Sequence, residues 1–385
     1  MAGAVLVILV IFNTEPEAKK EQATKKTAML VSVSPVETGT FTPTFSATGT
    51  VEAARDITLS SQVSGVVTRV SSSFIPGSYV GKGEKLIAIQ QLDYQNILEL
   101  RKSELEQAQA DLEIEMGRQK VAQQELELIG DTLSNNSQEL VLRKPQLDAI
   151  KSRVKAAQAS VNQAELNLRR TSIDAPFDAQ VISRNINVGS QVGVGENLGR
   201  MVGVDEYWVR ASLRLANLPW LSFPEEGGPG SPVTIRNRTA WPDSIYRHGM
   251  LYRLIGALDN QTRLASVLIQ VPDPLNYESK DSELPKLLIG SFVEVKIQAN
   301  AIRDVARLDR QYLRRNETVW VMEKGKLSIR QVEIAIKDEQ YAYIASGLEQ
   351  GEMVVTSSLA TISEGVNLRT DSDSTVNANT TPLKD

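Results

Sequence analysis

Two acidic pairs are the first residues of this 385-residue chain whose types could carry bond chemistry. Glu225 and Glu226 are adjacent, and Asp304 lies five positions before Asp309. Glycosidases use two carboxylates, one as a general acid and the other as a base or nucleophile. Because charged side chains are mostly exposed, we interpret both pairs as solvated surface and keep an enzyme as an alternative.

The other residue types that serve catalysis or metal binding are scarce. The chain has no cysteine, which excludes disulfides, thiolate chemistry and Cys-based metal sites. Its single histidine, His248, cannot form a multi-His metal site or pair with a second His. The seven methionines are scattered from Met1 to Met353, so no soft-metal relay is indicated. We therefore expect no catalytic residue, no bound cofactor and no metal site.

A ten-residue pattern, G-S-x-V-G-x-G-E-x-L, occurs at Gly77–Leu86 and again at Gly189–Leu198, with seven matching positions. Each copy follows an alternating apolar run and contains Gly-rich turns, which favour residues that tolerate positive φ. We expect two related β units whose turns are formed by Gly65, Gly77, Gly81, Gly83, Gly189, Gly193 and Gly195.

Two lysines in the first copy could act as nucleophilic amines that hold a prosthetic group. These are Lys82 and Lys85, but Val194 and Asn197 replace them in the second copy. We therefore interpret them as surface lysines.

The segment between the two copies, residues 92–170, has almost no Gly or Pro and is rich in helix-forming residues. Apolar residues recur there every seven positions. The first series is Leu98, Leu105, Leu112 and Leu126, and the second is Leu140, Leu147, Val154, Val161 and Leu168. Two such series predict an antiparallel coiled-coil hairpin with arms of roughly 50 Å.

Three polar residues, Arg101, Glu115 and Arg143, fall on the predicted seam of this hairpin. They are either solvated defects or selected contacts, and the sequence leaves both possibilities open. Gly130 ends the first arm, and capping residues follow it in a predicted connecting tip. Pro145 marks either a first helical turn or a kink.

Net charge and an N-terminal apolar run indicate which partners and which location are expected. The 42 basic and 47 acidic residues give a net charge of −5 without basic clusters, so nucleic acid is not expected as a partner. The apolar run Ala2–Phe12 has 11 residues and is shorter than the ~20 that span a bilayer. We interpret it as the end of an inner-membrane anchor or export signal that starts upstream, with a buried strand as the alternative.

The two β halves around the hairpin resemble the halves of lipoyl or biotinyl carrier domains. Ala175–Val181 is similar to the A-P-x-x-G-x-V opening of the second half, with Ala179 in the Gly place. At the turn after Ile89, where carriers hold their modified lysine, this chain has none, and the helical hairpin departs from that point.

The whole arrangement resembles the periplasmic adaptor subunits, or membrane fusion proteins, of tripartite efflux pumps, and most closely those of resistance-nodulation-division (RND) exporters. Besides the two repeats, Val63–Val70, Phe74–Ser78 and the hairpin exit Leu168–Phe177 carry this resemblance. It implies a mixed α+β, elongated, multi-domain fold, in which a long antiparallel coiled-coil α-hairpin is inserted in a split lipoyl-like β-sandwich, followed by β-barrel and membrane-proximal β domains.

The resemblance also implies a division of the chain into segments. The expected division is 1–27, a membrane anchor or signal remnant with a tether; 28–50 with 300–368, a membrane-proximal β domain that contributes to the barrel; 51–91 with 171–205, the lipoyl-like domain; 92–170, the hairpin; 206–299, the β-barrel; and 369–385, a disordered tail.

The function implied by the resemblance is that of a non-enzymatic adaptor in the periplasm, anchored to the inner membrane of a Gram-negative bacterium. Its implied partners are an RND transporter, a trimeric outer-membrane channel and further copies of itself in a hexameric ring. The expected channel contacts at the tip are Leu128, Gly130, Asp131, Thr132, Leu133, Ser134, Asn135, Asn136 and Ser137. Of the R-x-x-x-L-x-x-x-x-x-x-S docking motif of the family only the Leu is present, because Gln124 and Asn135 occupy the Arg and Ser positions.

Three other interpretations stay open at this point. An adaptor of an ABC-type exporter or type I secretion system would have a similar sequence pattern. A stand-alone structural coiled coil would lack a channel partner, and a carrier-domain enzyme subunit would need the attachment lysine. The exported substrate is not indicated by the sequence.

Overall fold

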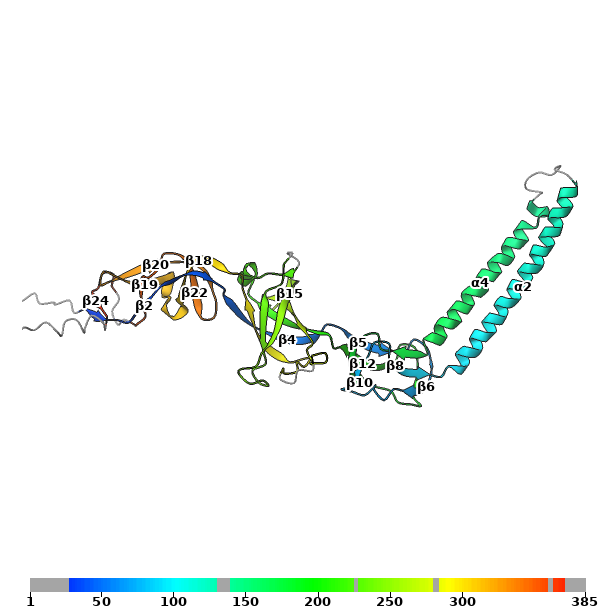
Figure 1. Cartoon of the computed structure of the whole chain (residues 1–385), viewed down its shortest axis with the longest axis horizontal. Coiled ribbons are helices and arrows are strands. Elements are labelled where there is room, and N and C mark those ends of the chain that lie inside the picture. Colours follow the sequence, from blue (N-terminus) through cyan, green and yellow to red (C-terminus); the bar gives the residue numbers. More distant parts are fainter. Residues whose placement is uncertain (1–27, 130–138, 225–227, 280–283, 359–362, 371–385) are drawn as a thin grey trace, which may run out of the picture. The chain divides into compact units, whose positions relative to one another are not determined.

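The computed structural model describes residues 28–129, 139–224, 228–279, 284–358 and 363–370 (Figure 1). The chain divides into two compact units, one formed by residues 1–46 and 298–385 and the other by residues 47–297. The N-terminal apolar run and the C-terminal tail discussed above lie outside the described residues.

A β-sandwich of two four-stranded sheets lies in the second unit. The first sheet has the order β5 (Asp56–Ser60), β12 (Asn197–Gly203), β10 (Ala179–Arg184), β7 (Tyr79–Val80). The second has the order β11 (Gln191–Val192), β6 (Gly65–Val70), β8 (Lys85–Ile89), β9 (Ser172–Asp174). Each sheet thus takes two strands from before the helical insertion and two from after it, so the two halves interlock.

The core of this sandwich is apolar and closed to solvent. Phe74, Ile89, Val181 and Leu198 are each fully buried within one cluster that draws on both halves. Since apolar burial is the main favourable term in folding, neither half retains this core without the other.

Two long helices leave the sandwich at neighbouring strands. α2 (Leu92–Ile129) follows β8 directly, and α4 (Lys144–Arg169) leads into β9. β8 and β9 pair antiparallel, with Ala88 opposite Ser172. The helices pack side by side, as Figure 1 shows, so the hairpin stands on one hydrogen-bonded strand pair.

A closed six-stranded barrel completes the second unit. Its order is β13 (Glu206–Leu213), β16 (Ala265–Pro272), β15 (Arg247–Leu258), β14 (Pro232–Arg236), β17 (Phe292–Gln298), β4 (Thr44–Ala53). Burial alternates along β16, as the period of two in a strand requires. A short 3-10 helix, Leu215–Trp220, follows β13.

The first unit consists of β-strands around two small apolar clusters. One sheet has the order β21 (Glu333–Lys337), β22 (Tyr341–Ser346), β18 (Ile302–Asp309), β3 (Glu37–Phe41). The other has the order β2 (Val33–Pro35), β23 (Met353–Val355), β19 (Thr318–Glu323), β20 (Lys326–Gln331). β1 (Met29–Leu30) pairs parallel with β24 (Leu368–Arg369), and the 3-10 helices are η3 (Arg310–Tyr312) and η4 (Arg315–Glu317).

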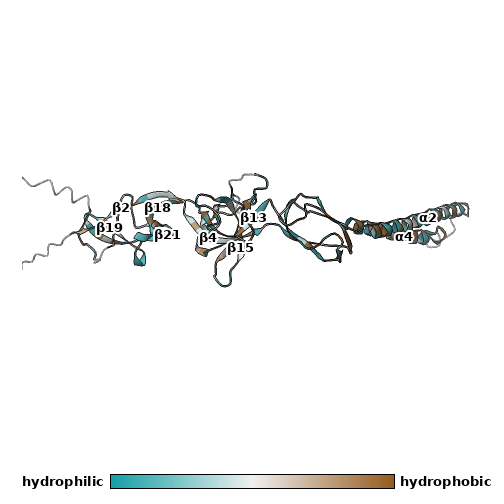
Figure 2. Cartoon of the chain, turned by 90° about the horizontal axis from the view of Figure 1, so that it is seen from below, coloured by the Kyte–Doolittle hydropathy of each residue, from teal (hydrophilic) through white to brown (hydrophobic). Residues whose placement is uncertain are grey.

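Hydropathy follows this architecture (Figure 2). Hydrophobic and hydrophilic residues are interspersed along both long helices. Among the described residues, no helix is both long enough and apolar enough to cross a membrane. The predicted fold class, a coiled-coil hairpin inserted in a split β-sandwich and followed by a barrel and further β structure, is confirmed.

Candidate functional site

The two copies of the repeat make matching hydrogen bonds, each to the other half of the sandwich. The amide of Gly77 donates to Val181 O at 2.8 Å, and the amide of Gly189 donates to Val67 O at 2.9 Å. Six positions later, Gly83 donates to Ala175 O and Gly195 to Ser61 O, both at 2.7 Å. The repeat is therefore a clamp that is used twice with approximate two-fold symmetry.

The seven glycines expected at turns fall into two groups. Those with positive φ between 79° and 91° are Gly77, Gly83, Gly189 and Gly195, and Gly65 has φ 156°. Gly81 and Gly193 do not have positive φ. Their amides donate instead to the carboxylates of Glu84 at 3.1 Å and Glu196 at 2.8 Å. These glutamates hold the same position in both copies of the repeat. This shared position was the signal in the sequence that could have identified them as turn residues.

The root of the hairpin is fixed by side chains that the sequence analysis did not single out. Thr171 is fully buried, its hydroxyl donates to Leu168 O at 2.6 Å, and it accepts from Gln91 Nε2 at 3.0 Å. The Tyr94 hydroxyl donates to Ser64 O at 2.7 Å, which ties the first turn of α2 to the loop before β6. The corner that holds the modified lysine in a carrier domain is occupied here by these hydrogen bonds.

The seam of the hairpin is apolar over most of its described length. Leu147 and Val161 of the second series are buried, and so are Ala108 on α2 and Ala164 on α4, each three positions after a member of a series. The prediction for Leu140 was wrong, because this side chain is 64% exposed. It precedes α4, whose regular helix begins only at Lys144.

Glu115 and Arg143, which both fall on the seam, contact each other. Arg143 Nε lies 2.6 Å from Glu115 Oε1, and its Nη2 donates to Oε2 at 3.2 Å. The Glu115 side chain is 3% exposed, whereas that of Arg143 is 38% exposed. Hydrogen bonds from Arg143 hold the pKa of the Glu115 carboxyl below its ordinary value, although burial acts in the opposite direction. The question left open by the sequence is thus answered by a specific ion pair between the helices.

Arg143 also shapes the entry into the second helix. It is the N-cap residue of α4 with φ 55° and ψ 25°, in the left-handed region that a non-Gly residue rarely adopts. Pro145 lies in the first turn of α4, which confirms the first of the two alternatives given for it. The third polar seam residue, Arg101, pairs with Glu104 of the same helix at 2.8 Å.

The expected channel contacts lie at the far end of this hairpin. Leu128, near the end of α2, is 88% exposed and covers no core. The residues Gly130, Asp131, Thr132, Leu133, Ser134, Asn135, Asn136 and Ser137 lie outside the described residues. The structure therefore describes the contacts at the seam and at the root of the hairpin, whereas the tip contacts stay a prediction.

The acidic pairs considered first take no catalytic arrangement in the described part of the chain. Glu225 and Glu226 lie outside it. The carboxylate of Asp309 accepts from the amide of Gln311 at 3.0 Å and caps η3, which is a structural role. Asp304 has φ 56° in β18. The described residues contain no group of three or more His, Asp or Glu side chains that could hold a metal ion.

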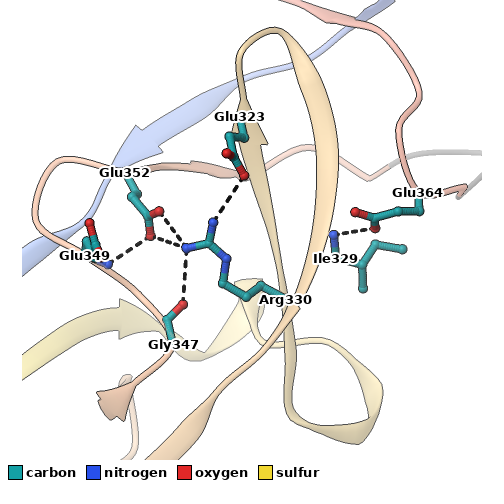
Figure 3. A network of polar contacts seen from close by, with 7 residues as sticks. All are labelled: Glu323, Ile329, Arg330, Gly347, Glu349, Glu352 and Glu364. Atoms are coloured by element: carbon teal, nitrogen blue, oxygen red, sulfur yellow. Dashed lines mark hydrogen bonds and ion pairs between the residues drawn. The ribbon is translucent and has the colours of Figure 1, made fainter.

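A second polar network lies in the first unit around Arg330 (Figure 3). Arg330 Nη1 donates to both carboxylate oxygens of Glu352, at 2.6 and 2.8 Å, and Nη2 lies 3.5 Å from Glu323. The Glu349 amide donates to the same Glu352 carboxylate at 2.9 Å. Burial raises the pKa of Glu352, but these hydrogen bonds outweigh burial and lower the pKa overall. The network ties β20 to the turn before β23.

Comparisons with known proteins fit this geometry. The family model of the CzcB-like barrel-sandwich hybrid domain matches residues 55–201, which contain both repeats and the hairpin. The model of the C-terminal permuted SH3 domain of RND MFPs matches residues 311–361 in the first unit. The chain belongs to the RND-type membrane fusion proteins.

Relatives and solved structures agree with this membership. This membrane fusion protein is 26% identical over 321 residues to the multidrug resistance protein MdtA of Pantoea ananatis strain AJ13355, covering 82% of this chain and 75% of that protein. It is 25% identical over 321 residues to MdtA of Escherichia coli strain K12, covering 82% of this chain and 74% of that protein.

The solved structure of MacA from Actinobacillus actinomycetemcomitans shares its fold, with a TM-score of 0.63, 22% identity, and coverage of 84% of this chain and 99% of that one. A MacA-MexA chimeric protein containing the Pseudomonas aeruginosa MexA alpha-hairpin domain does so with a TM-score of 0.58 and 21% identity, covering 83% of this chain and 98% of that one.

Proposed function

We propose that this membrane fusion protein is a periplasmic adaptor that links an inner-membrane RND transporter to a trimeric outer-membrane channel for the export of drugs or toxic compounds. It performs no bond chemistry, and the transporter supplies the energy. The observation that carries the proposal is the root of the hairpin. There the two helices leave the sandwich from the paired strands β8 and β9, and the hydrogen bonds of the two repeats join the halves of that sandwich.

Rigidity at this root is what an adaptor requires. A hairpin whose first turn is tied by Tyr94 and whose exit is tied by Thr171 transmits the position of its tip to the sandwich. The Glu115–Arg143 pair adds a fixed point along the hairpin, because an ion pair between two helices specifies their register. The hairpin is thus suited to hold a distance between two partners.

The expected segments take their roles from this arrangement. In the proposal, the apolar run Ala2–Phe12 tethers the chain to the inner membrane and the membrane-proximal β domain contacts the transporter. The sandwiches of several copies form a ring, and the tips of the hairpins meet the channel. Supporting this are the RND-type family models and relatives named for multidrug resistance.

The experiment that tests this function shortens the hairpin without disturbing its register. Glu115 pairs with Arg143, so a deletion that begins after Val121 leaves this pair in place. Replacing residues 122–137 with a short Gly-Asn turn shortens the hairpin and keeps the ion pair. Export is measured as drug resistance in a strain that lacks the native gene, and folding by the helical circular dichroism of the purified variant.

A matched control keeps the length and changes only the chemistry of the tip. In this variant residues 130–137 are replaced by eight Gly and Asn residues. We expect the shortened variant to lose export because its tip no longer reaches the channel, and the control to lose export only if tip side chains make the contact. Full resistance with the shortened hairpin would contradict the proposal.

The transporter class is tested separately. The family model that matches residues 311–361 is that of RND proteins, which favours an RND transporter over an ABC exporter. Copurification of the tagged chain from native membranes is expected to yield an RND transporter, and recovery of an ABC transporter would overturn this part of the proposal.

A further inference from the structure

A cleft of about 410 Å³ lies beside the root of the hairpin, where the end of α4 meets the edges of both sheets of the sandwich. Thr58 and Ser60 line it from β5, Ser172 lines it from β9, and Arg169 and Arg170 line it from the end of α4. β5 and β9 are the outermost strands of their described sheets, so each presents backbone groups that no neighbouring strand uses. The adaptor function proposed above gives this cleft no role.

Most of the polar side chains in the cleft have no partner within the protein. Five of them make no hydrogen bond or ion pair with any residue that the structure describes, namely Thr58, Ser60, Gln62, Arg169 and Arg170. Arg170 is half-buried. Only the Ser172 hydroxyl is already used, because it donates to Asp174 Oδ1 at 2.9 Å. The cleft therefore holds unused hydrogen-bonding capacity from two strands and a helix end.

This capacity consists mainly of donors. A guanidinium has several N–H groups and no acceptor, and the hydroxyls of Thr58 and Ser60 and the amide of Gln62 can each donate as well. The edge of a sheet also forms a concavity suited to anions, because its free backbone amides face outward. A ligand that offers only acceptors, which is an oxyanion, matches such a set.

The charge in the cleft is also suited to an anion. Arg169, Arg170 and Asp174 are the charged residues that line it. The two guanidinium groups outweigh the single carboxylate and the roughly half negative charge at the C-terminus of α4. Arg200 of the same sandwich, by contrast, makes two hydrogen bonds to the carboxylate of Asp56. Arg169 and Arg170 have no such carboxylate partner among the described residues, so an anion would supply one.

A phosphate group fits this set of donors better than a carboxylate. One guanidinium occupies both oxygens of a carboxylate in a bidentate pair. A phosphate group has a third terminal oxygen and can accept from two guanidinium groups and a hydroxyl together. The cleft has the volume of a small-molecule site, and Ile173 and Pro176 add apolar surface for the body of a ligand.

We propose that this cleft binds the phosphate group of a small phosphate monoester, which accepts hydrogen bonds from Arg169 and Arg170 and from the hydroxyls of Thr58 and Ser60. Because β5 and β9 belong to different sheets, a ligand held between them joins the end of α4 to the first sheet. A lipid headgroup can carry the same phosphate chemistry, so the test has one arm for each source.

Calorimetric titration of the full chain tests the site. The probes are glycerol 3-phosphate and phosphatidylcholine vesicles prepared with and without phosphatidic acid. The site variant is R169Q/R170Q. The matched control is R69Q/R184Q, which removes the same charge from two exposed arginines of the same sandwich that do not line the cleft. Helical circular dichroism shows whether each variant is folded.

We expect saturable binding of glycerol 3-phosphate with a Kd of about 1 mM or below, weakened at least about tenfold in R169Q/R170Q and less than about twofold in R69Q/R184Q. Binding to phosphatidic acid vesicles alone, with the same dependence on the variants, would assign the phosphate site to a lipid headgroup. An equal loss in both double variants would show that net charge alone attracts the anion and would overturn the site. The absence of binding to either probe would overturn it as well.

A neutral variant separates the cleft from its charge. Ser60 is exposed, and its side chain makes no hydrogen bond with the rest of the described chain, so S60A removes one donor and leaves the fold intact. We expect S60A to weaken binding at least about threefold, and S64A, at an exposed serine outside the cleft, to leave it unchanged. Unchanged affinity in S60A would overturn the participation of β5. The adaptor function is tested independently by the shortened hairpin, so either proposal can fail without the other.

Discussion

Substituting one leucine in each copy of the repeat tests whether the two halves of the sandwich fold as one body. Leu86 and Leu198 hold the same final position of the pattern and are 1% and 0% exposed in the same core. Their strands lie in different sheets, β8 and β12, and each sheet contains strands from both halves. We expect Leu86→Ala and Leu198→Ala to destabilise both halves equally.

The magnitude follows from the burial. Each substitution removes about three carbon groups, and the loss of their transfer free energy amounts to roughly 2.4 kcal/mol at ~0.8 kcal/mol per group. The cavity left behind adds to this, and core Leu→Ala changes cost about 2–5 kcal/mol in total. A value of about 3 kcal/mol corresponds to roughly 150-fold faster amide exchange through the unfolded sandwich.

The assay is hydrogen exchange of the intact protein, followed at amides whose hydrogen bonds cross between the halves. Gly77 bonded to Val181 and Gly189 bonded to Val67 report on both. Val194→Ala is the matched control, because Val194 lies in the same repeat but is 71% exposed, and we expect less than about 0.5 kcal/mol of destabilisation. If either core substitution accelerated exchange in only one half, or by less than about fivefold, the interlocked clamp would be refuted.

Three further predictions concern other contacts. Gly199→Ala is expected to destabilise the sandwich by about 1–3 kcal/mol in chemical denaturation, because the new Cβ would lie 2.8 Å from the Phe74 ring and closer still to a backbone oxygen; an unchanged midpoint would contradict this. The Glu115 carboxylate, whose pKa Arg143 lowers, contributes stability above the ordinary value of 4.5 that is lost as pH falls through the lowered pKa. Thermal melts of Glu115→Gln are therefore expected to lose part of the wild-type pH dependence in acid, and identical pH profiles would argue against the ion pair. Arg247 is 5% exposed and donates to Pro285 O and Asp273 O. Arg247→Met is therefore expected to leave buried carbonyls unsatisfied and to accelerate hydrogen exchange at the Leu287 amide. Unchanged exchange at this amide would show that the guanidinium does not hold the loop.

Much of the fold could be predicted because its strongest patterns are periodic. The seven-residue series located both helices, and the doubled G-S-x-V-G-x-G-E-x-L pattern located the two halves of the sandwich. The exchange of strands between the sheets could not be read from the sequence, because pairing partners such as Gly77 and Val181 are far apart in the chain. The resemblance implied that residues 28–50 contribute to the barrel, but the pairing of β4 with β13 likewise joins residues far apart in the chain.

The candidate site was less predictable, and the reasons are local. Leu140 fits the apolar series, but Arg143 takes a left-handed conformation, so the regular helix begins after it and Leu140 stays exposed. The polar seam residues were visible in the sequence, whereas their pairing depends on the register of two separate helices.

Photocrosslinking in living cells tests most directly whether the tip of the hairpin contacts an outer-membrane channel. A photoreactive residue at Ser134 probes the tip, and one at Phe292, which is 66% exposed at the start of β17, probes the barrel. We expect the tip to capture an outer-membrane channel and the barrel not to capture it. Capture of the channel from Phe292, with none from Ser134, would contradict it.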